Sequence, residues 1–206
     1  MLYIMMIRIH PDTPSLRQIE TAVQILADGG LVVYPTDSVY AIGCSLLKPK
    51  AIERLARLRG MKANKARFSF VFHDLSDLAL YTRPISNPVF KMIRRVTPGP
   101  FTFILEANNK IPKLVLSNRK TIGIRIPDNN IARELVHHLG HPMLSTSVHD
   151  DDDIVEYTTD PELIHEKYQH EVDLVINGGY GDNEVTTVVD CTGPEIEILR
   201  QGKGVL

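Results

Sequence analysis

Two segments of the chain combine residue types that suit the binding of phosphate and of small amino acids. The string YPTDSVYAIG (34 to 43) places Thr36, Asp37 and Ser38 directly after a proline that ends an apolar run. Residues 53 to 67 hold six cations and a single acid. Arginine offers paired donors to phosphate oxygens and lysine a mobile charge, so these cations can form a phosphate-binding wall. A solvated basic helix end explains them equally well. The six cations are Arg54, Arg57, Arg59, Lys62, Lys65 and Arg67.

Two further segments place polar groups at the ends of apolar runs. Arg125 lies in the otherwise apolar string TIGIRIP (121 to 127), where Gly123 leaves room for close approach. A buried guanidinium without a partner is costly, so Arg125 should meet either a structural acid or a ligand carboxylate. The string PMLSTSVH (142 to 149) ends in three hydroxyls and an imidazole. Hydroxyls at this place either cap a following helix or bind phosphate and amino-acid groups.

The elements that must position these groups follow from the spacing of apolar residues, which switches repeatedly between a period of two and one of about 3.6. This alternation is typical of an α/β domain. Ser15 with Gln18 forms a capping-box signature for a helix that Gly29 and Gly30 end. We predict strands at residues 2–9, 31–34, 68–72, 101–105, 121–126, 172–176, 187–190 and 196–199, with a short one within 142–149. We predict helices at residues 15–27, 49–59, 129–139 and 161–168. No repeat or low-complexity linker interrupts them, so residues 1–206 are expected to form a single domain.

Composition and missing motifs exclude several classes of protein. With 43% apolar and 23% charged residues and a formal charge of −2, the chain has no overall signature of a nucleic-acid binder. No apolar run approaches the roughly 20 residues of a membrane helix, and no signal peptide is recognisable, so a cytoplasmic location is expected.

His137 and His141 flank Gly140 at a helix end, which argues against a zinc site. The acidic run 150–153 is expected to be a solvated loop rather than a magnesium site. GxSxG, P-loop and GxGxxG motifs do not occur.

Six strings, in this order, resemble those of the YrdC family of threonylcarbamoyl-AMP synthases. PTDSVYAIG, TPGPFTFIL and TIGIRIPDN are similar to the family's PTDTVYGLG-like string, its PGP-plus-strand segment and its VRVP strand. STSV, TTVVD and RQG are similar to its STSAN, STVVD and REG segments. The resemblance runs from about Ile19 to Gly202. The segment RLRGMKANKARFSFVFHDLS is closer to the YciO branch of the family than to the standard synthases.

The resemblance implies a YrdC-like single domain, in which a twisted mixed β-sheet flanked by helices surrounds a positively charged concave cleft. Family members condense threonine, bicarbonate and ATP into threonylcarbamoyl-AMP and pyrophosphate, for the modification of adenosine 37 in certain tRNAs. By the same resemblance, threonine would be held by Thr36, Arg125, Ser145 and Thr187, with Arg125 on its carboxylate. ATP, which would bring Mg²⁺ with it, would be held by Arg59, Thr121, Ser147 and Arg200. This chemistry requires no protein nucleophile and no metal site of the protein's own.

Two positions depart from the family's pattern. Where the family has a KxR motif, this chain has Arg59, Gly60 and Met61, and where the family has the asparagine of SxN, this chain has His149. Loss of a cation beside a triphosphate weakens charge stabilisation unless a neighbouring lysine replaces it. Two functions therefore stay open: a weak or diverged synthase-like nucleotidyltransferase, and a module that binds tRNA or double-stranded RNA without chemistry. For RNA binding, the basic wall would be extended by Arg94, Arg95, Arg119 and Lys120.

Overall fold

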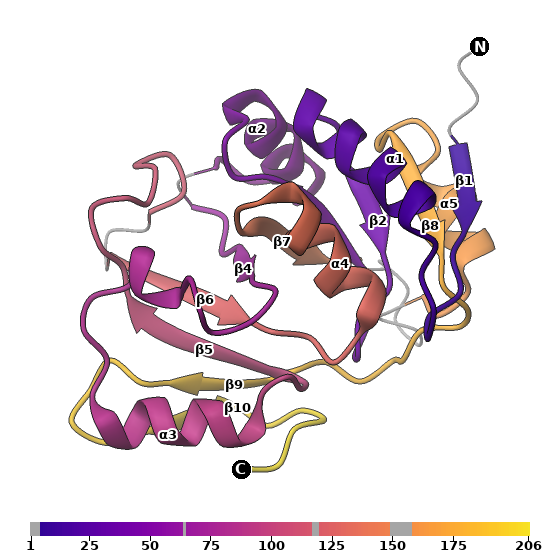
Figure 1. Cartoon of the computed structure of the whole chain (residues 1–206). Helices are drawn as coiled ribbons and strands as arrows, with labels where there is room; N and C mark the ends of the chain where they lie inside the picture. The colour runs from indigo at the N-terminus through magenta and orange to yellow at the C-terminus, as the bar shows by residue number, and fades with distance from the viewer. Residues whose placement is uncertain (1–4, 64, 117–119, 149–157) are drawn as a thin grey trace.

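The computed structural model of the chain describes residues 5–63, 65–116, 120–148 and 158–206. These residues form one ten-stranded mixed sheet flanked by five α-helices and a short 3-10 helix, η1 (Leu78–Leu80) (Figure 1). The strands are β1 (Met5–Arg8), β2 (Val32–Tyr34), β3 (Ala41–Ser45), β4 (Ser69–Val71), β5 (Phe101–Glu106), β6 (Thr121–Arg125), β7 (Met143–Ser147), β8 (Leu174–Asn177), β9 (Thr187–Asp190) and β10 (Glu197–Arg200). The helices are α1 (Leu16–Asp28), α2 (Pro49–Leu58), α3 (Asn87–Val96), α4 (Asn130–Leu139) and α5 (Pro161–Tyr168). The strand order is β1-β8-β2-β3-β7-β4-β6-β5-β9-β10, and the predicted α/β class is confirmed.

The directions of the strands explain how distant segments meet. Pairing is antiparallel from β2 to β3, from β3 to β7 and from β7 to β4, and parallel from β4 to β6. It follows that β2 and β6 run in opposite directions, and in a flat sheet their C-terminal ends would lie at opposite edges. The sheet is twisted, however, and Figure 1 shows the strands turning from near vertical at β1 and β2 to near horizontal at β5 and β6. The segment after β2 therefore reaches the end of β6, where a side-chain hydrogen bond joins the two.

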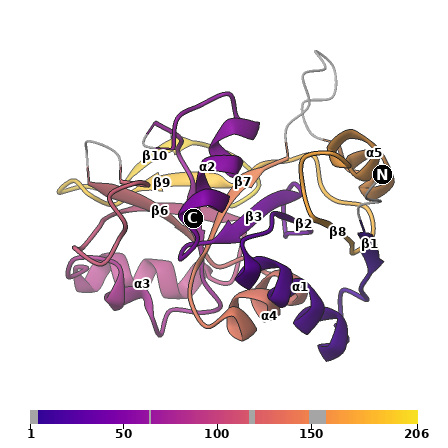
Figure 2. The same cartoon turned by 90° about the horizontal axis from the view of Figure 1, so that it is seen from above.

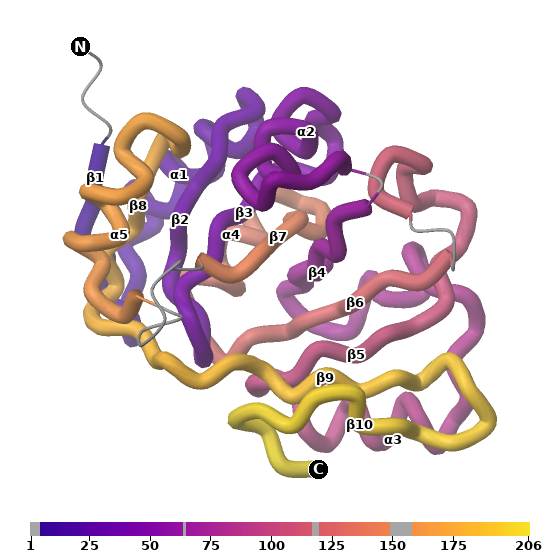
Figure 3. The backbone as a smooth tube through the Cα atoms, turned by 180° about the vertical axis from the view of Figure 1, so that it is seen from behind, coloured from indigo at the N-terminus to yellow at the C-terminus, as the bar shows by residue number. Residues whose placement is uncertain are grey.

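Buried apolar side chains form two clusters that hold the helices on the sheet. In the larger cluster, Leu55 of α2, Ile93 of α3 and Ile164 of α5 join the strands. In the smaller cluster, Leu26 of α1 and Leu135 of α4 do the same. Figure 2 shows α1 beside α4, and Figure 3 shows α5 lying against β8. Each such side chain contributes about 1.5–3 kcal/mol on burial, so the sheet is a rigid support for the polar groups at its strand ends.

The helix termini agree with the sequence signals except at α1. The side chain of Asn129 accepts a hydrogen bond from the Ala132 amide at 3.0 Å at the start of α4, and Gly140 ends that helix with a φ of +75°. Ser15 stands at the N-cap of α1 but makes no side-chain hydrogen bond there. Gln18 instead donates to the Arg8 carbonyl at 2.7 Å. The capping box predicted at this helix is therefore wrong, although the helix itself is present.

Besides the short η1, one helix and one strand were not expected. The helix α3 carries the apolar spacing Val89, Ile93 and Val96, but it is short and begins at Asn87-Pro88. The strand β3 continues from the polar string that follows β2, because Tyr40 and its neighbours are fully buried rather than part of a surface turn. Among the described residues, no helix is long and apolar enough to cross a membrane.

Candidate functional site

The bend after β2 is held in shape by its own hydrogen bonds. The Thr36 hydroxyl donates to the Val39 carbonyl at 2.8 Å and accepts from the Ser38 amide at 3.1 Å. A further bond of 3.1 Å joins the hydroxyls of Thr36 and Ser38. These contacts fix the backbone between Pro35 and Val39, so the Asp37 side chain is presented in one direction, towards the end of β6.

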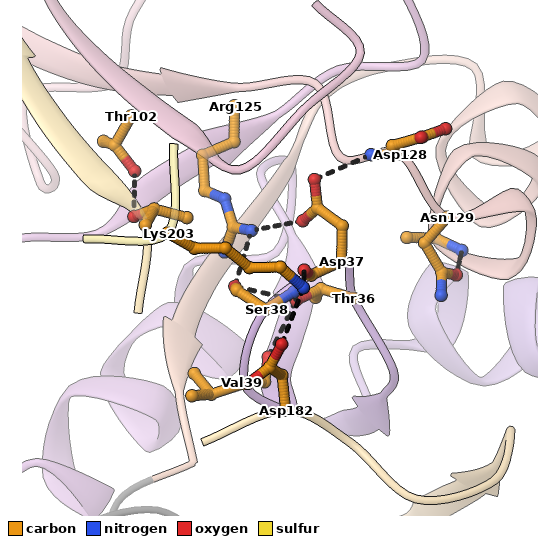
Figure 4. A network of polar contacts seen from close by, with 12 residues as sticks. Thr36, Asp37, Ser38, Val39, Thr102, Arg125, Asp128, Asn129, Asp182 and Lys203 are labelled. Carbon is orange, nitrogen blue, oxygen red and sulfur yellow. Dashed lines mark hydrogen bonds and ion pairs between the residues drawn. The ribbon is translucent and has the colours of Figure 1, made fainter. Parts of the chain in front are cut away.

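Arg125 meets that side chain in the interior (Figure 4). Its Nη2 donates to Asp37 Oδ1 at 3.0 Å and to Ser38 Oγ at 3.1 Å. The two charged side chains are only 7% and 8% exposed. Asp37 Oδ2 accepts from the Asp128 amide at 2.9 Å, which ties the loop after β6 to the same carboxylate. Of the two partners considered for Arg125, the structure provides the acid, and that acid belongs to the Thr36 bend.

One donor of Arg125 stays unsatisfied. Its Nε is buried and has no hydrogen-bond partner among the described residues. A buried polar group without a partner is unfavourable. The guanidinium therefore has hydrogen-bonding capacity beyond the Asp37 pair.

The serines of β7 lie beside small residues of the neighbouring strands. The register places Gly43, Ser145, Ser69 and Gly123 in one row across β3, β7, β4 and β6. Ser145 is buried and shares a hydrogen bond of 2.6 Å with the Tyr34 hydroxyl. Burial raises the pKa of Tyr34 to about 12, so this hydroxyl stays protonated at neutral pH. Ser147, at the end of β7 opposite Ala41, is half-buried.

The C-terminal segment closes the other side of the site. The buried hydroxyl of Thr187 donates to the Gly204 carbonyl at 2.6 Å and accepts from the Gly202 amide at 3.0 Å. The Arg200 guanidinium donates to the Thr186 carbonyl at 2.9 and 3.2 Å. Thr187 and Arg200 thus hold their own segment in place, so their effect on a ligand would be exerted through that segment.

The same segment carries Lys203 into the site, and the sequence motifs did not indicate this residue. Its Nζ donates to the Asp37 carbonyl at 2.9 Å and to Asp182 Oδ2 at 2.6 Å. The hydrogen bond from Lys203 is the main reason that the pKa of Asp182 lies below its ordinary value. Lys203 is the one charge after Arg200 in the sequence, which is the signal that could have identified it.

A hollow of about 400 Å³ lies over these groups. Its walls include Thr36, Asp37, Tyr180, Asp182, Asn183 and Lys203. Of the residues assigned to substrates from the resemblance, Thr36 lines this hollow directly. Arg125 stands behind it, joined through Asp37.

Residues 53–67, called the basic segment below, form a separate and exposed feature. Arg54 pairs at 3.0 Å with Asp173, which directly precedes β8. The other cations of the segment are exposed, and none pairs with an acid among the described residues; they are Arg57, Arg59, Lys62, Lys65 and Arg67. Met61 is 50% exposed in the same loop. Thr121 is half-buried at the start of β6. His149, the run 150–153 and Arg119 lie outside the described residues.

Comparison with known proteins identifies the family. A family model named Sua5_yciO_yrdC and described as "Telomere recombination" matches residues 24–202, and the chain belongs to this family. It is 46% identical over 199 residues to an uncharacterized protein of Haemophilus influenzae and 42% identical over 198 residues to YciO of Escherichia coli. Each match covers 95% of this chain and 94% of the other. A threonylcarbamoyl-AMP synthase of Nitrosococcus oceani is 30% identical over 130 residues, covering 63% of this chain and 70% of the synthase.

Two solved structures share the fold. The crystal structure of E. coli YciO matches with a TM-score of 0.90 and 40% identity, over 98% of this chain and 97% of that one. P. abyssi Sua5 complexed with L-threonine matches with a TM-score of 0.85 and 23% identity, over 96% of this chain and 57% of that one. The family and fold expected from the motifs are confirmed.

The buried ion pair yields a first test. Removing one partner leaves the other charged and unpaired, so Asp37→Ala should lower the free energy of unfolding by about 3–5 kcal/mol. In the double variant Asp37→Ala/Arg125→Met neither charge remains, and the loss should be smaller than the sum of the two single losses. Urea denaturation of the wild type, both single variants and the double variant measures these differences.

The matched control is Asp182→Ala, which removes an ion pair from the same hollow. The Lys203 and Asp182 side chains are 40% and 33% exposed, and such partly solvated pairs contribute about 0–1 kcal/mol. Equal losses for Asp37→Ala and Asp182→Ala would show that the Asp37 pair has no special role in the fold.

Proposed function

We propose that this protein is a nucleotidyltransferase of the threonylcarbamoyl-AMP synthase type, with ATP, L-threonine and bicarbonate as substrates. The observation that carries the proposal is the buried Arg125, which is fixed behind a ligand-sized hollow by the Thr36 bend. The family, the synthase relative and the Sua5 structure with L-threonine support it. The product would serve the modification of adenosine 37 in tRNA.

The proposed reaction has two bond-forming stages. The threonine amine adds to bicarbonate and releases water, which yields a carbamate. A carbamate oxygen then attacks the α-phosphorus of ATP, and the bond from that phosphorus to the pyrophosphate oxygen breaks. The products are threonylcarbamoyl-AMP and pyrophosphate. Since the nucleophile comes from the substrate, the protein needs to position the reactants and stabilise charge. Mg²⁺ would enter with the triphosphate as part of the substrate.

The amino acid would bind at the inner end of the hollow. A guanidinium has five donors in a fork, and Arg125 uses Nη2 for Asp37 and Ser38. The substrate carboxylate would bind beside Asp37 on the same guanidinium, with Thr36 and Ser145 close to the threonine side chain. Thr187 would act as a positioning residue, because its hydroxyl holds the segment that carries Lys203.

The phosphates of the nucleotide would bind on the side of the sheet that carries the basic segment. Arg59 at the end of α2, Thr121 and Ser147 would face its phosphates, and Arg200 would contribute by fixing the backbone at Thr186. The exposed cations near Arg59 would attract the departing pyrophosphate.

Pyrophosphate release tests this proposal. The wild type should release pyrophosphate only when ATP, threonine and bicarbonate are all present. Arg125→Lys keeps a positive charge but removes the paired donors of the guanidinium. Because one or two charge-assisted hydrogen bonds to the substrate carboxylate are then lost, the KM for threonine should rise by about 10- to 100-fold. Leu47→Ala, at an exposed site beyond β3, is the control and should match the wild type. Pyrophosphate release independent of threonine, or none above that of Thr36→Ala, would refute the synthase function.

The Met61 position gives a second test of the same function. If the lost cation limits charge stabilisation, Met61→Arg should raise kcat at least about tenfold, because a cation on a transferring phosphoryl group is worth several kcal/mol. The double variant Met61→Arg/His149→Asn should gain further. An unchanged kcat in both would mean that Met61 does not stand where the triphosphate lies.

A second function, binding of tRNA or double-stranded RNA, is favoured by the exposed cations of the basic segment. Removing four of them should weaken RNA binding and reduce the slope of log affinity against log salt by about 3. The variant is Arg57→Ala/Lys62→Ala/Lys65→Ala/Arg67→Ala, and filter binding at several salt concentrations is the measurement. The control removes the same charge from other exposed positions with Arg17→Ala/Lys91→Ala/Lys110→Ala/Lys113→Ala. Equal slopes for both variants would exclude a specific RNA surface at this segment.

A further inference from the structure

Tyr180 is an aromatic side chain held out into solvent at the wall of the hollow. It is 81% exposed, although burying an aromatic ring of this size would be favourable by about 1.5–3 kcal/mol. Its loop contains three glycines, Gly178, Gly179 and Gly181, and Gly179 has a φ of +95° that side chains rarely adopt. A loop of this kind would be expected to move, but this one is anchored.

The anchors lie on both sides of Tyr180. The buried Tyr40 hydroxyl donates to the Gly179 carbonyl at 2.6 Å and accepts from the Gly178 amide at 3.1 Å. Burial raises the pKa of Tyr40 to about 12, so it remains a donor at neutral pH. After Tyr180, the Gly181 amide donates to the Thr159 carbonyl at 2.8 Å. Tyr180 is therefore an exposed ring on a fixed backbone, which lowers the entropic cost of contacting a ligand.

The charges around the hollow limit what that ligand can be. Asp37 is paired with Arg125 and Asp182 with Lys203, so the charges at the hollow balance and it has no excess of positive charge for a polyphosphate. Carboxylates and the Asn183 amide can instead bond to hydroxyl and amino groups. The volume of about 400 Å³ lies within the roughly 300–1,000 Å³ of small-ligand sites. An aromatic face beside charge-balanced hydrogen-bonding groups suits a base and its ribose.

We propose that Tyr180 is the stacking platform for the nucleobase of the nucleotide substrate, and that the base lies at the mouth of the hollow. This position leaves the inner end of the hollow to the amino acid and lets the α-phosphorus reach the carbamate, while the other two phosphates lie outside. This inference rests on the proposed function, since it assigns one end of the same nucleotide. Stacking of a base on an aromatic side chain is worth about 1–3 kcal/mol, which corresponds to about 5- to 150-fold in affinity.

The absence of tryptophan from the sequence makes a direct test available. Tyr180→Trp creates a single fluorophore at the platform, and Leu47→Trp creates one at an exposed site beyond the other end of β3. ATP should quench the first saturably and leave the second unchanged. Inorganic tripolyphosphate, which has no base, should quench neither.

Calorimetric titration completes the experiment. Tyr180→Ala should weaken ATP binding about 5- to 150-fold and leave tripolyphosphate binding unaltered, whereas Tyr180→Phe should retain the wild-type affinity for ATP. Equal ATP affinities for the wild type and Tyr180→Ala would overturn the role of Tyr180 while leaving nucleotide binding intact. Absence of ATP binding to the wild type would overturn both this inference and the synthase function, so the two failures are distinguishable.

Discussion

The buried ion pair between Arg125 and Asp37 is the contact on which the rest of the site depends. A single charge at this depth would be expelled or neutralised, since its desolvation is not repaid without a partner. Together the two side chains join the bend after β2, the end of β6 and the Asp128 backbone. The sheet twist brings these segments close, and the ion pair fixes the distance between them. A hollow with defined walls follows from that constraint.

The charged residues of the chain divide by burial into groups with different physical roles. The Arg125–Asp37 pair is desolvated, so its attraction is strong and fixes the geometry of the site. Lys203 and Asp182 remain partly solvated, so their attraction is weaker and can yield to a ligand at low cost. The cations of the basic segment other than Arg54 are exposed, and they act over distance through a field that salt screens. This division explains how a chain with a formal charge of −2 can still present a strongly positive surface at one place.

The sequence was sufficient for the fold class, the family and the positions of most strands along the chain. Apolar periodicity is a local signal, and the six strings identify the family as a set. It could not decide the partner of Arg125, since Asp37 is 88 positions away and only the twist of the sheet brings the two together. The same limitation concealed Lys203, whose partners are distant along the chain. The helix α3 was missed because ten residues offer few turns over which periodicity can be recognised. Arg54 looked like part of a basic wall, yet its guanidinium bonds to Asp173 of a remote segment.

The spacing of the groups around Asp37 along the chain has a consequence for synthesis. Its partners lie 88, 91 and 166 positions further on, at Arg125, Asp128 and Lys203. On the ribosome, a nascent chain can form the bend early but cannot surround it until residue 203 has left the exit tunnel. Contacts of such long sequence separation close late, after the loss of chain entropy has been offset by the core. A ligand in the cell can therefore encounter the completed site only on molecules whose residue 203 has already emerged from the ribosome.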